Sequence, residues 1–239
     1  METPVETLLV VTHVSAGLTA LVVAPVAMLT RKGGGPHRRW GRVYFWAMFT
    51  IFITALGLLL FRPNVFLFFI SVLSFYGAFS GVRSLRRKNP AKGGRATRLD
   101  HAAAGAATVA GGSFIVWGLL PLTGLVTGEL PTAFSVLGVA FGVALGRDAL
   151  TDLRSFRRPD PDPLWWWTYH LERMVGSYLA AVTAFMVQNV GPRLPDAWVW
   201  TVWVAPGVLG GVGIGYWIRY YRKKFSARAS GTGAVSTQN

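Results

Sequence analysis

The 239-residue sequence is 52% hydrophobic and only 14% charged, whereas soluble domains carry about 25% charged residues. Its net charge of +14 comes from 24 Lys and Arg against 10 Asp and Glu. These basic residues lie between long apolar runs, so a membrane surface with anionic headgroups, and not nucleic acid, explains the charge. Because cysteine is absent, disulfides, thiolate catalysis and cysteine-ligated metal clusters are excluded.

Seven apolar runs predict seven transmembrane helices, each long enough at 1.5 Å per residue to cross a hydrocarbon core of about 30 Å. Pro- and Gly-rich segments separate them. The predicted spans are residues 7–29, 43–62, 65–84, 100–121, 132–152, 165–189 and 197–218. We therefore predict an all-α transmembrane bundle over residues 1–225. The Ser-, Gly- and Ala-rich residues 226–239 predict a disordered cytoplasmic tail.

Basic residues alternate along the predicted loops. All of them except Arg62, Arg173 and Arg193 fall in or beside the first, third and fifth loops and the C-terminal tail. Since Lys and Arg accumulate on the cytoplasmic side of membrane proteins, we expect the N-terminus outside and the C-terminus in the cytoplasm. The expected location is the bacterial inner membrane, with a multi-pass topology.

Several predicted spans carry glycines four residues apart, which places them on one helix face and allows a second backbone to approach closely. We expect them to serve packing inside the bundle, with a dimerisation face as the alternative. The glycines are Gly77 and Gly81, then Gly138, Gly142 and Gly146, then Gly207, Gly211 and Gly215.

Three histidines belong to the predicted cytoplasmic side. His101 and His170 are expected at one depth on different helices, an arrangement that axial ligation of haem b needs. His37 would add a third imidazole, and Glu172 or Asp100 would complete a divalent metal site. The alternative is that these are interfacial histidines hydrogen-bonded to water, headgroups or loop carbonyls.

The sixth span carries a polar stripe at helical spacing, formed by His170, Arg173, Ser177 and Gln188. Such a stripe is suited to line a cavity, and the alternative is that Arg173 extends to the inner headgroups. In the first span, His13 is expected to be a hydrogen-bonded polar residue that faces the bundle. An ionisable residue in a span is nevertheless a functional candidate.

Two carboxylates, Asp148 and Asp152, lie one turn apart at the inner end of the fifth span, close to Arg147 and Arg154 in sequence. They are suited to bind a cation or relay protons. Local ion pairs at a charged helix end are the favoured alternative.

Two stretches resemble a bacterial family of predicted multi-pass membrane proteins catalogued as domain of unknown function 2306. One is His13 with Gly17, followed by the segment His37-Arg38-Arg39-Trp40-Gly41-Arg42-Val43-Tyr44, and the other runs from Trp167 to Ala184. The resemblance covers most of the chain from His13 to Ala184 and implies a multi-pass topology but no reaction. Its signature positions are His13, His37, Arg38, Gly41, Arg42 and His170.

Three functions are compatible with these features, and no strong catalytic constellation is present. The favoured hypothesis is an accessory or structural subunit that binds other membrane subunits, because the chain is rich in packing glycines and tryptophan. The second is a b-type haem or divalent-metal redox protein that uses the cytoplasmic-side histidines. The third is a small-solute or proton transporter with a path along the polar stripe.

Overall fold

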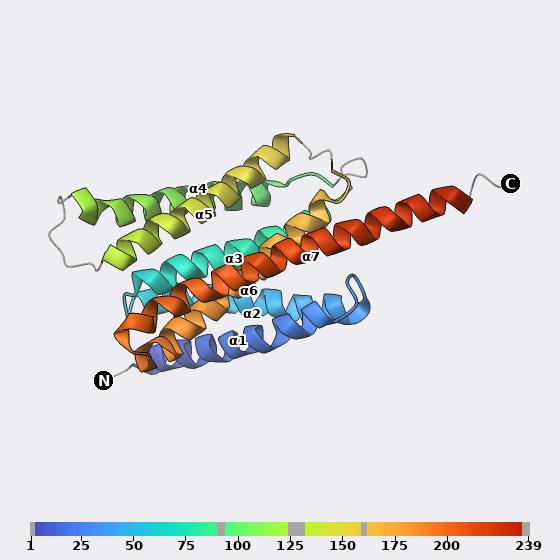
Figure 1. The fold of residues 1–239 in the computed structure, drawn as a ribbon. Helices are drawn as coiled ribbons and strands as arrows, with labels where there is room; N and C mark the ends of the chain where they lie inside the picture. The colour runs from blue at the N-terminus through green and yellow to red at the C-terminus, as the bar shows by residue number, and fades with distance from the viewer. Residues whose placement is uncertain (1–2, 90–93, 124–131, 159–161, 236–239) are drawn as a thin grey trace.

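The computed structural model describes residues 3–89, 94–123, 132–158 and 162–235, and all regular structure within these ranges is helical. Seven α-helices follow one another along the chain, and short 3₁₀ helices flank α4 and α7 (Figure 1). The α-helices are α1 (Pro4–Leu29), α2 (Gly35–Leu59), α3 (Val65–Arg86), α4 (Arg98–Leu119), α5 (Thr132–Arg157), α6 (Trp165–Asn189) and α7 (Val199–Val235). The 3₁₀ helices are η2 (Leu120–Thr123), η3 (Gly191–Arg193) and η4 (Asp196–Trp198).

The predicted spans are confirmed as helices, and the largest differences from the predicted bounds are at the start of α2 and the end of α7. Helix α2 begins at Gly35, earlier than predicted, because Pro36 occupies the first turn, where a missing N–H costs no hydrogen bond. Helix α7 continues to Val235. The tail predicted to be disordered over residues 226–239 is therefore helical as far as Val235, and its last four residues lie outside the described ranges.

Six of the seven α-helices are long and apolar enough to cross a membrane, within the part of the chain that the structure describes. The exception is α5, whose second half carries Arg147, Asp148 and Asp152. Charged side chains inside a span are costly unless they face other helices. The six apolar helices identify the chain as a multi-pass membrane protein, in which α5 depends on its neighbours.

Side-chain caps explain where three helices begin. Thr3, Asn64 and Thr97 precede α1, α3 and α4, and the side-chain oxygen of each accepts a hydrogen bond from a backbone N–H three residues further on. Asp100 completes a capping box at α4 by accepting from the Thr97 backbone N–H at 2.7 Å. These contacts satisfy backbone donors that a helix leaves open at its start.

Helix α3 lies at the centre and contacts α2, α4, α5 and α6. Helices α1 and α2 form one antiparallel pair, α4 and α5 form another, and α7 packs along α6 (Figure 1). One apolar cluster, with Tyr44 and Met48 at its core, joins α1, α2 and α3. A second, with Phe114 and Leu145, joins α3, α4 and α5. The two chain ends lie at opposite ends of the bundle (Figure 1).

The glycines behave differently from one helix to the next. A Cβ atom on Gly77 or Gly81 would lie 3.1 or 3.0 Å from Arg173 of α6, and one on Gly142 would lie 2.6 Å from the Gly111 carbonyl oxygen of α4. Packing of α3 on α6 and of α5 on α4 therefore needs glycine, as predicted. By contrast, a Cβ on Gly207 or Gly211 of α7 would meet no atom within 4 Å.

Candidate functional site

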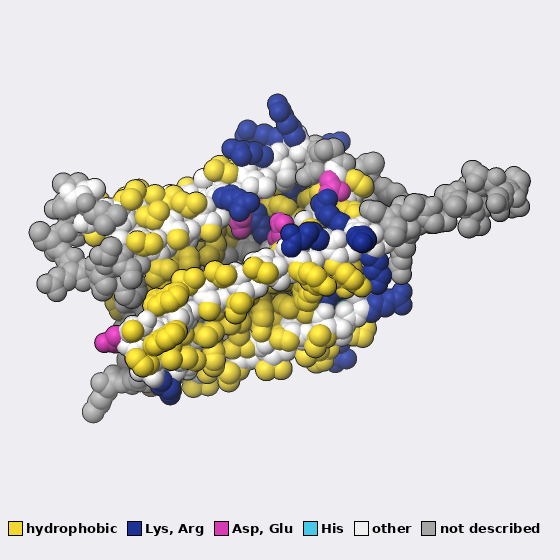
Figure 2. All heavy atoms as spheres, in the orientation of Figure 1, with side chains coloured by type: hydrophobic (Ala, Val, Ile, Leu, Met, Phe, Trp, Pro, Cys, Tyr) yellow, Lys and Arg dark blue, Asp and Glu magenta, His cyan; other side chains and the backbone are white. Residues whose placement is uncertain are grey.

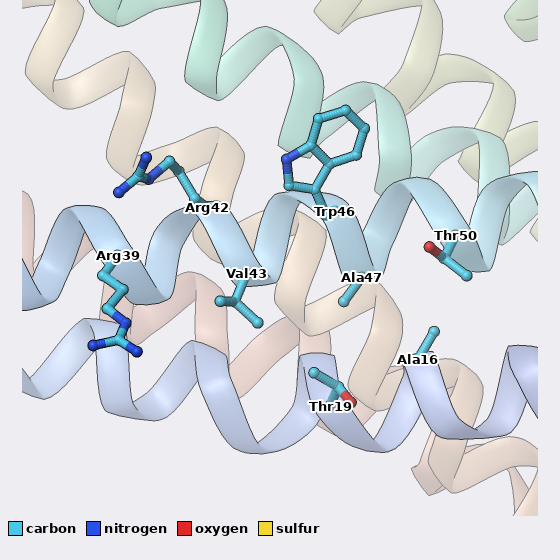
Figure 3. Close-up of a pocket in the computed structure, with 8 residues that line it drawn as sticks. All are labelled: Ala16, Thr19, Arg39, Arg42, Val43, Trp46, Ala47 and Thr50. Atoms are coloured by element: carbon cyan, nitrogen blue, oxygen red, sulfur yellow. The ribbon is translucent and has the colours of Figure 1, made fainter.

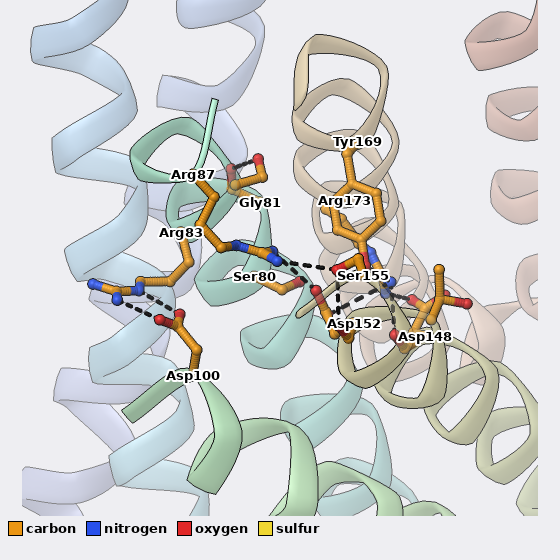
Figure 4. A network of polar contacts seen from close by, with 12 residues as sticks. Ser80, Gly81, Arg83, Arg87, Asp100, Asp148, Asp152, Ser155, Tyr169 and Arg173 are labelled. Carbon is orange, nitrogen blue, oxygen red and sulfur yellow. Dashed lines mark hydrogen bonds and ion pairs between the residues drawn. The ribbon is translucent and has the colours of Figure 1, made fainter. Parts of the chain in front are cut away.

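Most of the Lys and Arg side chains visible in Figure 2 lie at the end of the bundle from which the C-terminus emerges. Just inside that end, ionisable side chains of α3, α4, α5 and α6 meet in the interior (Figure 4). We call this group the polar cluster. Its charged members are Arg83, Arg87, Asp100, Asp148, Asp152 and Arg173.

Asp152 of α5 joins the most helices in the polar cluster, and its side chain is 1% exposed. One carboxylate oxygen accepts a hydrogen bond from the hydroxyl of Tyr76 at 2.8 Å. The other accepts from Nη2 of Arg87 at 3.1 Å. Nη2 of Arg173 lies 3.8 Å from the same carboxylate. Asp152 therefore connects α5 to α3 through two residues and to α6 through a third.

Arg173 is buried and points toward α5 (Figure 4). It forms an ion pair with Asp148 and donates from Nη2 to the Asp148 backbone carbonyl at 2.9 Å and to the Tyr169 hydroxyl at 2.7 Å. The alternative, in which Arg173 extends to the inner headgroups, is therefore wrong. A guanidinium has five N–H donors in a fixed plane, so it can serve several acceptors on two helices at once.

Arg83 and Asp100 form the second buried pair, which joins α3 to the start of α4. Nε and Nη2 of Arg83 each donate to a different carboxylate oxygen at 2.6 Å. Nη2 also donates to the Thr97 hydroxyl at 2.9 Å. Because Asp100 also belongs to the capping box of α4, this two-fold ion pair fixes the first turn of α4 against α3.

A cavity of about 10 Å³ lies between the Arg83–Asp100 pair and the group around Asp152. It is lined by Tyr76, Arg83, Arg87, Asp100 and Asp152 among others. This space is close to the smallest that holds one water molecule. The cluster holds three arginines and three aspartates, so its formal charge is zero. Paired charges of this kind fix the mutual position of helices, since separating any pair leaves a charge uncompensated in the interior.

His37 and His170 come together beside the polar cluster, with ring centroids 6.3 Å apart and planes at 77°. Nδ1 of His37 is 2.9 Å from the Ala27 carbonyl oxygen, and Nδ1 of His170 is 2.9 Å from that of Gly81. A carbonyl oxygen only accepts, so Nδ1 carries the proton in both rings. When a ring is neutral, its Nε2 then presents a lone pair, as in metal-ligating histidines.

Lys32, in the loop before α2, lies near this histidine pair. It donates to the Met28 carbonyl, and its ammonium group is 5.5 Å from the ring centroid of Trp217 on α7. Burial lowers the pKa of Lys32. Lys32 and His37 together satisfy carbonyl groups at the C-terminal end of α1, where the helix dipole favours positive charge.

The histidine arrangement predicted from sequence differs from the one observed. His101 is exposed, lies against Phe156 with ring centroids 4.9 Å apart, and has Nδ1 3.0 Å from the Thr97 carbonyl oxygen. The contacts of His101 thus lie at the start of α4 and on α5, whereas those of His170 lie on α2 and α3. Glu172 is exposed on α6. No three His, Asp or Glu side chains converge as a metal site needs in the described ranges, so His37, His101, His170 and Glu172 do not form one.

The polar stripe of α6 is divided among different neighbours. Ser177 is hydrogen-bonded to the Tyr44 hydroxyl at 2.9 Å, whereas Gln188 is exposed near the other end of the helix. His170 and Arg173 have the partners described above. In α1, the half-buried His13 faces α2, where its Nδ1 lies 2.9 Å from the Thr54 hydroxyl, as expected for a polar residue directed into the bundle.

Sequence reasoning missed Tyr76, Arg83, Arg87 and Tyr169 as members of the interior site. The signal available was that Arg83 and Arg87 lie at the end of a Ser- and Gly-rich helix, whose small residues leave space beside it. Comparison of the chain with protein-family models, with curated proteins and with solved structures finds no match.

Proposed function

We propose that this protein is an accessory or structural subunit of a membrane complex in the bacterial inner membrane. In this proposal the N-terminus lies outside and the C-terminus in the cytoplasm. Support for the orientation comes from the Lys and Arg side chains gathered at the C-terminal end of the bundle (Figure 2). At the opposite end the basic Arg62 is neutralised by Glu6, at 2.5 Å.

The use of the interior polar groups supports a structural role. Every charged member of the polar cluster is engaged in an ion pair between helices or helix ends. Ser177, which the transporter hypothesis needs on a solute path, is 2% exposed and bonded to Tyr44. Polar side chains that are already paired with one another inside the bundle are not available to bind a solute. Their pairing therefore favours a fixed bundle over a path for solutes.

The observation that carries the proposal is the outer face of α7. This helix contacts α6 and the short helices η3 and η4, and Gly207 and Gly211 face open space. Exposed apolar side chains surround them, including Val208, Leu209 and Val212. Glycines four residues apart on an exposed apolar face let another transmembrane helix approach closely. We infer that a helix of a partner subunit packs here.

Site-specific photo-crosslinking in native membranes tests this proposal. A photoreactive residue replaces Leu209 of α7 in one variant and Val109 of α4 in the control. The two positions are matched, since Leu209 is 72% exposed and Val109 is 71% exposed. We expect a discrete heteromeric adduct from position 209 only. Adding Gly211→Ile is expected to remove that adduct, because the branched side chain fills the space of the partner backbone.

Three outcomes would contradict the subunit proposal. One is the absence of a discrete adduct at position 209, and another is equal crosslinking at positions 209 and 109. The third is an adduct with the mass of two copies of this chain, which would make α7 a homodimer interface.

A second candidate function is transition-metal binding by His37 and His170. It is favoured by the two adjacent rings whose Nδ1 protons are donated to carbonyls, which leaves Nε2 of each available. Both residues are signature positions of the multi-pass family that the sequence resembles, and membership of that family stays a proposal. With two protein ligands, water or another small ligand would complete the coordination sphere.

Titration of the purified chain with Co²⁺ tests the second candidate, because the ion's visible spectrum reports its ligands. We expect one site, lost in His37→Ala and in His170→Ala and retained in the control His101→Ala. Retention of the spectrum in both single variants would contradict the assignment.

A further inference from the structure

A groove of about 570 Å³ runs between α1 and α2 on the outside of the bundle. In Figure 3, Val43 and Ala47 of α2 point toward Thr19 and Ala16 of α1. Arg39 lies at one end of this row, on the first turns of α2. The volume lies within the range of ligand-binding pockets.

Side-chain size explains the space between these two closely packed helices. Ala16 and Thr19 lie about one turn apart on α1, and Ala47 and Thr50 do so on α2, so four small side chains face the same gap. Trp46 forms one wall and is 61% exposed. The groove is thus an apolar channel with an aromatic side and is open toward the surrounding membrane.

Positive charge is confined to one end of the groove. Arg39 and Arg42 are both exposed, and neither guanidinium has a hydrogen bond or ion pair within the described part of the chain. No Asp or Glu occurs in the sequence between Glu6 and Asp100. These two guanidinium groups therefore suit a ligand that brings its own negative charge, and arginine is well shaped to bind phosphate oxygens.

The length of the groove matches one leaflet of a bilayer. The segment of α2 from Arg39 to Thr50 is about 16 Å long at 1.5 Å per residue. The hydrocarbon core of a bilayer is about 30 Å thick, so half of it is about 15 Å. When the arginines lie at headgroup depth, the small-residue channel therefore extends to the bilayer midplane.

We propose that the α1–α2 groove binds one anionic phospholipid. Arg39 and Arg42 bind the phosphodiester headgroup, and one acyl chain lies in the channel beside Trp46. The inference rests on the proposed membrane placement, and the proposed orientation assigns the lipid to the cytoplasmic leaflet. It goes beyond attraction of basic loops to anionic lipid, since it names a site with a defined shape.

Native mass spectrometry of the full chain released from nanodiscs tests the site. The nanodiscs contain phosphatidylcholine with a minor fraction of phosphatidylglycerol. We expect the wild-type chain to retain one phosphatidylglycerol. The double variant Arg39→Gln/Arg42→Gln is expected to bind it about thirtyfold more weakly, since the two basic residues together contribute about 2 kcal/mol near anionic lipid and every 1.4 kcal/mol is a factor of about ten. The control is Arg38→Gln/Arg157→Gln, which removes equal charge from exposed positions outside the groove.

A second variant separates acyl-chain binding from headgroup binding. Thr19→Phe fills the channel and keeps both arginines. Thr19 is exposed, and its hydroxyl donates to the Ser15 carbonyl of the same helix at 2.8 Å. We expect weaker retention of phosphatidylglycerol in this variant. Millimolar inorganic phosphate is expected not to displace the lipid, whereas displacement would identify a free-phosphate site.

The proposal is overturned if the groove variant and the charge-matched control lose the lipid equally, because the attraction is then diffuse. It is also overturned if Arg39→Gln/Arg42→Gln retains wild-type binding. Circular dichroism of each variant checks that the helices are intact. The two faces of a nanodisc are equivalent, so an error in the proposed orientation or in the subunit role does not alter this result.

Discussion

At the scale of single residues, Asp152 explains why the interior of the bundle tolerates charge. Its carboxylate is almost fully buried and is bonded to Tyr76 and Arg87 of the α3 segment, with Arg173 of α6 close by. A buried carboxylate without partners would be costly. With these partners it instead determines how three helices face one another.

We predict that Asp152→Asn lowers the free energy of unfolding by about 3 kcal/mol, because it leaves Arg87 buried without its counter-charge. Denaturant titration in detergent, followed by circular dichroism, measures the change. The control is Asp162→Asn, which removes a pair with Arg222 that is partly exposed and is expected to cost at most about 1 kcal/mol. Equal effects of the two substitutions would show that burial of the Asp152 pair does not contribute.

The sequence predicted that Asp148 and Asp152 lie at one end of the fifth span. It did not predict which residues they pair with. Local pairing with Arg147 and Arg154 was the favoured expectation, and the structure pairs Asp148 with Arg173 and Asp152 with Arg87 instead. Residues four apart share a helix face, whereas neighbours along the chain do not. The two aspartates therefore point together toward α3 and α6, away from the adjacent arginines.

The histidines show the same limit. Sequence predicted that several of them share one membrane side, but depth along the membrane does not specify which helices are neighbours. His170 lies beside His37, whereas His101 lies on α4 against Phe156 of α5. The helix neighbours result from the packing of α3 between α6 and the α4–α5 pair.

At the scale of elements, close approach of α4 and α5 depends on one face of α4. A Cβ on Gly111 would lie 2.9 Å from the Gly142 carbonyl oxygen and from the Gly146 backbone nitrogen, whereas one on Gly112 would meet nothing within 4 Å. Backbone atoms cannot move aside as a flexible side chain can. The two adjacent glycines therefore provide a matched pair of substitutions.

We predict that Gly111→Val lowers the free energy of unfolding by about 2 kcal/mol, within the range for overpacked interiors. Gly112→Val is expected to change it by less than about 0.5 kcal/mol, since exposed substitutions have small effects. Denaturant unfolding in one detergent compares the variants. A larger effect at Gly112 would contradict the observed packing, in which Gly111 and not Gly112 faces α5.

Glycine spacing predicted which helix faces allow a neighbouring backbone to approach closely, but it did not predict which helix packs on each face. The stripes of α3 and α5 pack on α6 and α4, whereas Gly207 and Gly211 of α7 face outward. The pattern in sequence is the same in each case, because spacing fixes a face relative to its own helix only. The neighbour of that face is a property of the whole bundle.

At the scale of the whole molecule, the number and approximate limits of the helices followed from sequence, since a hydrocarbon core demands long apolar runs. The start of α2 did not, because Pro- and Gly-rich segments were expected to separate the spans, whereas Pro36 lies in the first turn of α2. The two ends of the bundle carry different charge, and this difference predicts an orientation in the membrane. That orientation can be tested by labelling each end.

The absence of cysteine allows single cysteines to report the orientation without background. We predict that a membrane-impermeant maleimide labels Leu60→Cys in cells whose outer membrane is permeabilised. Arg38→Cys is expected to react only after the inner membrane is opened. Leu60 and Arg38 are both exposed and belong to opposite ends of α2. The reverse labelling pattern would place the N-terminus in the cytoplasm.

The composition of α5 has a consequence for biogenesis. Asp and Arg each cost about 2.5–3.5 kcal/mol at the centre of a helix that enters lipid alone, and α5 carries Arg147, Asp148 and Asp152. Arg87 is already synthesised when α5 leaves the ribosome, but Arg173 is not. A nascent chain that stops before α6 therefore exposes Asp148 without its counter-charge. We therefore expect stable integration of α5 to require α6, so that the two segments enter the bilayer as one cooperative unit.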